Sequence, residues 1–118
     1  MLLLRLNVCQ LAGEGFVGVD KAEFLALADS SSQPPDGLSP CLHALLLGRR
    51  GAWEESHDIV NDIDTLLGSW IHAWLHRVEG DLPNANYWYR LAGRSEECGE
   101  LELEWGALVD AALAPPSA

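Results

Sequence analysis

Start and stop signals for helices recur at short intervals along this chain, and they constrain its fold more than any other feature. Asp20, with Glu23 three residues later, has the pattern of a capping box. Ser39 followed by Pro40 is a favoured entry into another helix. Gly80 is a natural stop, because glycine adopts the left-handed conformation that ends a helix without steric cost. The signals predict helices beginning near Asp20, Ser39, Ala52, Thr65, Asp81 and Glu100.

Apolar residues between these signals recur at helical spacing. From Ile71 to Val78 they occupy positions i, i+3, i+4 and i+7, and no strand pattern of comparable quality follows Asp20. We therefore predict a single all-α domain over residues 1–118, built from five or six antiparallel helices. Residues 1–18 fit either a strand or the start of a buried helix, and residues 114–118 are expected to form a disordered tail.

The charge balance excludes one class of partner. Seven Lys and Arg against 18 Asp and Glu give a formal net charge of −11, which repels phosphate backbones, so no nucleic-acid partner is expected. The apolar start MLLLRLNVC is too short to span a bilayer and lacks a cleavage site, so we expect no membrane association. The spacing of the three cysteines suggests neither a disulfide framework nor a zinc site, and a cytoplasmic location is expected.

A repeat lies at the centre of the chain. Shifting the sequence by 29 residues places His43 on His72, Ala44 on Ala73, Leu46 on Leu75 and Gly51 on Gly80. The predicted order of helix, glycine turn and helix coincides as well. Residues 40–63 and 69–92 are therefore interpreted as two copies of one helical hairpin.

The second copy resembles the tetratricopeptide repeat. Its small and aromatic positions are Ala73, Gly80, Ala85, Tyr89 and Ala92, which in that family let two helices pack closely. The match is degenerate, because the period is 29 residues where the family has about 34, and the closing proline is missing. The resemblance implies a non-enzymatic protein-binding or scaffold protein without a cofactor. Its partner is expected to be a protein or peptide in a groove lined by Tyr87, Arg90 and Arg94, and a homo-oligomer is compatible with the sequence.

Two histidines stand where the family places apolar or aromatic residues. His72 and His76 share a helix flank with Glu79, and the resemblance implies that this flank faces the helix carrying Tyr89. These four residues form an expected polar seam. Buried imidazoles need partners, and one interpretation is a structural pair hydrogen-bonded to Tyr87, Tyr89, Asn84 or Glu79.

Two further interpretations give the histidines a chemical role. Imidazoles at i and i+4 can share a divalent transition metal, with Glu79, Asp58 or His57 completing the site. A general base is the other interpretation, with Glu79 or Asp81 orienting His72 or His76, and an anionic substrate held by Arg77, Arg90 or Arg94. A small metal-binding protein or enzyme is therefore the alternative function. The acidic run from Glu96 to Gly106 is interpreted as a solvated acidic face over an apolar stripe.

Overall fold

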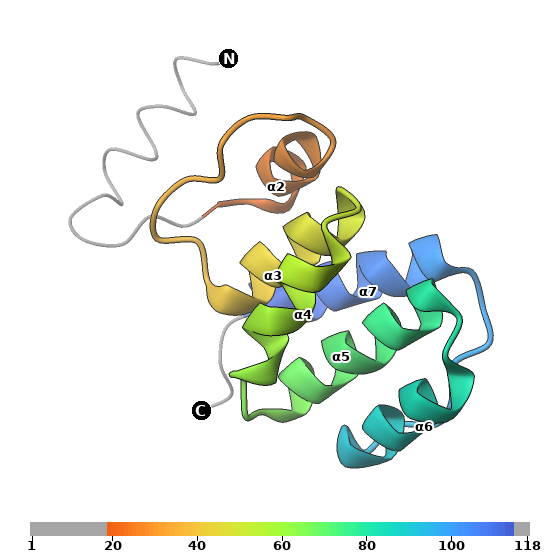
Figure 1. Cartoon of the computed structure of the whole chain (residues 1–118). Coiled ribbons are helices and arrows are strands. Elements are labelled where there is room, and N and C mark those ends of the chain that lie inside the picture. The colour runs from red at the N-terminus through yellow and green to blue at the C-terminus, as the bar shows by residue number, and fades with distance from the viewer. Residues whose placement is uncertain (1–18, 115–118) are drawn as a thin grey trace.

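The computed structural model describes residues 19–114, and all regular structure within that range is helical (Figure 1). The helices are α2 (Lys21–Ala28), α3 (Pro40–Arg49), α4 (Trp53–Asn61), α5 (Leu66–Glu79), α6 (Leu82–Leu91) and α7 (Leu101–Leu113). The all-α class is thus confirmed for these residues, while the expectations for residues 1–18 and 115–118 lie outside them. None of these helices has the length and apolar character needed to cross a bilayer.

The predicted start signals operate as expected. The Asp20 carboxylate accepts the backbone N–H of Glu23 at 2.8 Å, and the Glu23 carboxylate accepts that of Asp20 at 3.1 Å, which completes the capping box. Ser39 and Thr65 cap α3 and α5 through their hydroxyl oxygens. Gly80 ends α5 with a φ of 88°, a left-handed conformation that suits glycine.

Helix α5 lies at the centre of the described fold. It packs against α3, α4, α6 and α7, while α2 covers α3 and α7. In Figure 1, α7 runs behind α5, and α6 lies on the side of α5 opposite to α3. The fully buried apolar side chains include Phe24, Leu45, Leu46, Ile71, Leu75 and Leu108. Because α5 is covered on most sides, a buried polar side chain on it needs a hydrogen-bond partner in the protein or a bound ligand.

A buried carboxylate fastens α7 to this centre. Glu104 accepts the indole N–H of Trp70 at 3.0 Å, the hydroxyl of Tyr89 at 2.5 Å and a guanidinium N–H of Arg77 at 2.6 Å. Burial, followed by the adjacent Glu104 carboxylate, raises the pKa of Tyr89 far above its usual value, so the phenol remains a donor. The expectation that the acidic side chains of residues 96–106 lie on a solvated face is therefore wrong at Glu104, which is buried.

Candidate metal centre

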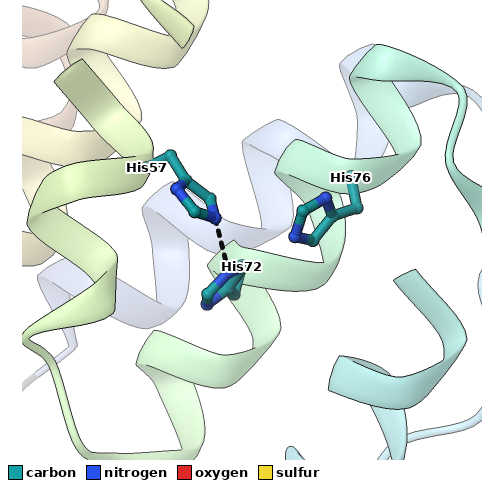
Figure 2. Close-up of side chains that lie close together, drawn as sticks. All are labelled: His57, His72 and His76. Carbon is teal, nitrogen blue, oxygen red and sulfur yellow. Dashed lines mark hydrogen bonds between the residues drawn. The ribbon is translucent and has the colours of Figure 1, made fainter. Parts of the chain in front are cut away.

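Three histidines meet where α4 crosses α5. His57 comes from α4, while His72 and His76 lie one turn apart on α5, and their rings converge in Figure 2. One ring nitrogen from each lies within 4.8 Å of the others. The Nε2 atoms of His57 and His72 are 2.9 Å apart, which is a hydrogen-bonding distance. We call His57, His72 and His76 the histidine cluster.

Buried contacts set the position of each ring. His72 and His76 are only 2% and 5% exposed, because their flank of α5 is covered by neighbouring helices. Helix α4 is held against α5 by the Trp53 indole, whose N–H donates to the Leu75 carbonyl at 2.6 Å. His57 follows Trp53 by one helical turn and is half-buried. The cluster therefore has two deep members and one at its mouth.

Two indole rings form the walls of the cluster. Trp88 from α6 stacks on His72, with ring centroids 3.7 Å apart and an interplanar angle of 11°. Trp53 stacks on His57 at 4.7 Å and the same angle. Flat stacking restricts rotation of the two imidazoles and shields one face of each ring from water. Neither tryptophan is among the site residues expected from the sequence, although the i, i+4 spacing of Trp53 and His57 is a local signal of their contact.

The surroundings keep two imidazoles neutral. Burial, reinforced by the positive charge that His57 and His76 can carry, lowers the pKa of His72 to about 4. Burial and then His76 also lower the pKa of His57, although nearby Asp58 opposes the effect. At neutral pH both rings consequently offer a lone pair and no charge, which is the form that binds a metal ion.

A carboxylate orients the third histidine. The Nδ1 atom of His76 lies 2.7 Å from a carboxylate oxygen of Glu79. An Nδ1–H donated to this carboxylate leaves Nε2 as the unprotonated nitrogen of the ring. A carboxylate behind a ligating histidine is a recurrent feature of metal sites, because it fixes the tautomer and raises the basicity of the ligand.

The other expected site residues are dispersed. The Tyr89 hydroxyl bonds Glu104, so Tyr89 does not belong to a seam with the histidines. Tyr87 is exposed and meets the edge of Trp88, and the Arg94 guanidinium lies over the Trp70 ring at 3.5 Å. Arg90 is exposed at the end of α6. Of the hydrogen-bond partners expected for the histidine pair, only Glu79 is confirmed.

A second group of possible ligands shares His76 with the cluster. His76, Glu79 and Asp81 have ligand atoms within 4.8 Å of one another, but both carboxylates are exposed. Asp81 also caps α6 by accepting the backbone N–H of Asn84 at 3.3 Å. Because one carboxylate is committed to a helix cap and the other to His76, the histidine cluster is the better candidate.

Acidification should weaken the metal-free fold through His72. Its pKa is about 4 in the folded chain and near 6.5 when unfolded, so the unfolded chain binds the proton more readily between these values. The contribution of neutral His72 to the free energy of unfolding is fully present above about pH 6.5. It is lost as the pH falls towards 4, and the loss is at most about 3 kcal/mol. Urea unfolding in EDTA at a series of pH values measures this loss of stability. His72→Leu, which cannot titrate, should show a flatter profile than the unaltered protein, and parallel profiles would contradict the assignment.

No protein-family model, curated protein or solved structure matches this chain. The function is therefore argued from the geometry of the site itself.

Proposed function

We propose that this protein binds one divalent transition-metal ion through His57, His72 and His76. The observation that carries the proposal is the convergence of three imidazole nitrogens within 4.8 Å in a largely buried site. Three imidazoles suit Zn²⁺, Cu²⁺, Ni²⁺ or Co²⁺, whereas Mg²⁺ and Ca²⁺ prefer oxygen ligands. Buried polar rings need partners, and a shared ion would partner all three imidazoles at once, in place of the bond between His57 and His72.

The distance between His57 and His72 requires only a small adjustment. Two imidazole nitrogens bound to one tetrahedral Zn²⁺ at about 2.0–2.1 Å lie roughly 3.3 Å apart. The observed Nε2 to Nε2 distance of 2.9 Å between His57 and His72 would therefore open by a few tenths of an ångström. In the metal-free cluster, one of these two rings donates an Nε2–H to the Nε2 atom of the other. An ion held by both Nε2 atoms requires the donating ring to carry its proton on Nδ1 instead. This tautomer change needs no net loss of a proton.

Three protein ligands leave one tetrahedral position for another group. In zinc proteins, three protein ligands with water in the fourth position are typical of catalytic sites, whereas structural sites are closed by four. The half-buried His57 is the member of the cluster nearest solvent, so water is expected to enter on its side. The observations support metal binding most directly, and a hydrolytic role for the bound water is a second candidate that the open position favours.

Metal analysis of the full-length protein tests the proposal. Protein prepared without chelator and dialysed against micromolar Zn²⁺ should retain about one equivalent, measured by plasma mass spectrometry. The double variant His72→Ala, His76→Ala should retain none. His43→Ala is the matched control, because His43 lies at the corresponding position of the other helix pair and outside the cluster. Equal retention by the double variant, or no retention by the unaltered protein, would contradict the proposal.

Replacing Glu79 with glutamine should weaken metal binding without abolishing it. The amide can no longer act as a strong acceptor for the Nδ1–H of His76, and losses of this kind typically cost about 10–100-fold in affinity. Competition titration with a coloured zinc chelator measures the change. Glu55→Gln is a suitable control, since Glu55 is an exposed residue of α4 that is not part of the cluster. An unchanged affinity in Glu79→Gln would remove Glu79 from the site.

We also propose that the two helix pairs α3–α4 and α5–α6 are copies of one tetratricopeptide-like hairpin. Corresponding positions support this proposal: Ala44 and Ala73 are both fully buried, and Gly51 and Gly80 have φ values of 85° and 88°. Further along, Ser56 and Ala85 are both fully buried. A cytoplasmic location remains part of the proposal, because the exposed thiol of Cys98 suits a reducing compartment.

A further inference from the structure

A cleft of about 800 Å³ opens beside the connection between α4 and α5, and no histidine of the cluster is among its lining residues. Its apolar wall includes Ile63, Leu66, Trp88 and Leu91, and its rim carries Asp62 and Asp64. The wall joins the end of α6 to the start of α5, so residues distant in sequence form one surface. This cleft contains none of Tyr87, Arg90 and Arg94, the residues expected to line a partner groove.

Large apolar side chains in the cleft face solvent. Leu66 is 67% exposed and Leu91 is 47% exposed. One face of the Trp88 ring stacks on His72, and the Trp88 side chain also lines the cleft. Removing such side chains from water is favourable, by about 25 cal/mol for each Å² of apolar surface buried. The cleft therefore offers an anchor point for an apolar side chain of a partner.

The rim determines the charge of that partner. Asp62 and Asp64 are exposed, and neither carboxylate makes an ion pair or hydrogen bond within the part of the chain that the structure describes. Both residues precede the exposed Leu66 in the lining of the cleft, on a chain with a formal net charge of −11. Nucleic acids, anionic lipid surfaces and a second copy of this acidic chain all meet like charge here. A cationic partner gains attraction and a faster association rate.

We propose that the cleft binds a basic peptide segment, which inserts an aliphatic or aromatic side chain beside Leu66, Trp88 and Leu91 and places lysine or arginine against Asp62 and Asp64. An amphipathic helix has this arrangement, because apolar residues at i and i+4 share a face flanked by charged ones. No histidine of the cluster lines the cleft, although Trp88 contacts both sites. We therefore expect the peptide to bind in the absence of metal.

A pair of synthetic peptides tests the proposal in the presence of EDTA. Both are fluorescein-labelled amphipathic helices with leucines at the same positions, and the remaining positions are lysine in one and glutamate in the other. Fluorescence anisotropy with the full-length protein should show binding of the lysine peptide, with a dissociation constant on the order of micromolar. That affinity should fall about tenfold or more as salt rises from 0.05 to 0.5 M, because salt screens exposed charges. Absence of binding, or equal binding of both peptides, would overturn the proposal.

Variants separate this cleft from general attraction to an acidic protein. Asp62→Lys with Asp64→Lys should weaken binding at least tenfold. The control, Asp36→Lys with Glu96→Lys, changes net charge equally at exposed residues outside the cleft and should have a much smaller effect. An equal loss in the control pair would refute the cleft as the site. Sedimentation of the unaltered protein should show a monomer, and a dimer dispersed by the Asp62 and Asp64 changes would instead make a second copy the occupant.

One further variant tests the apolar anchor. Leu66→Glu adds negative charge, so it should strengthen a purely electrostatic complex but weaken one that depends on the apolar wall. We expect at least fivefold weaker binding. Leu103→Glu is the matched control, since Leu103 is 72% exposed on α7 and outside the cleft. A gain in affinity for Leu66→Glu would show that no side chain enters the cleft and would overturn the proposed mode of binding.

Discussion

Replacing Glu104 with leucine is expected to lower the free energy of unfolding by about 3–5 kcal/mol, because it leaves a largely buried guanidinium without its counter-ion. Arg77 points into the same interior, where its side chain is 11% exposed. The substitution also removes the acceptor of the Trp70 and Tyr89 donors, and unsatisfied buried donors add to the cost. Three helices depend on this carboxylate, since its partners come from α5 and α6 while Glu104 lies on α7.

Urea unfolding followed by circular dichroism measures the effect. Glu102→Leu is the matched control on the same helix, because Glu102 is exposed and pairs with Arg49 at the surface, so its loss should cost only about 0–1 kcal/mol. The double variant Glu104→Leu, Arg77→Met should recover part of the loss, since an apolar pair can replace a buried ion pair. Equal stability of Glu104→Leu and Glu102→Leu would show that the buried network does not hold α7 in place.

Replacing His72 with alanine is expected to lower metal affinity about 1000-fold, equivalent to roughly 4 kcal/mol. His72 is the most buried member of the cluster and the one whose ring is fixed by stacking on Trp88. Its loss leaves two imidazoles, one of them half-exposed on α4, so the ion loses both a bond and its enclosure.

Competition titration of the single variant against a zinc chelator gives this number. His43→Ala should bind as the unaltered protein does. A change of less than about tenfold in His72→Ala would show that any bound metal sits elsewhere, for example at His76, Glu79 and Asp81. Unfolding of His72→Ala in EDTA, compared with the same measurement at saturating Zn²⁺, separates loss of the ligand from loss of the fold, because a bound ion stabilises only the state that binds it.

The sequence predicts the helices well because their limits are local. Asp20, Ser39 and Thr65 cap helices through bonds to backbone N–H groups three residues away, and Gly80 ends α5 by its own backbone conformation. All the atoms that make such a cap or stop therefore lie within four or five consecutive residues, so the sequence pattern is enough to predict it. The helix starts are therefore confirmed, whereas an end is less exact: the first hairpin is predicted to run to residue 63, but α4 stops at Asn61.

Only part of the candidate site can be predicted from the sequence, because one of its histidines is brought in by contacts between helices that are not local. His72 and His76 lie on one helix, so their proximity follows from i, i+4 spacing, and Glu79 follows from i, i+3. His57 reaches them only through the packing of α4 on α5, which no local pattern specifies. Tyr89 shows the same limit, because its helical position was predicted correctly while its partner, Glu104, lies on a helix whose packing the sequence does not reveal.

X-ray absorption spectroscopy of the zinc-loaded protein tests the central claim most directly, because imidazole ligands give characteristic multiple scattering. Three imidazole nitrogens and one further light atom at about 2.0–2.1 Å are predicted, with the imidazole signal reduced in His72→Ala. A spectrum with one imidazole or none, or one unchanged by the substitution, would contradict a metal centre at His57, His72 and His76.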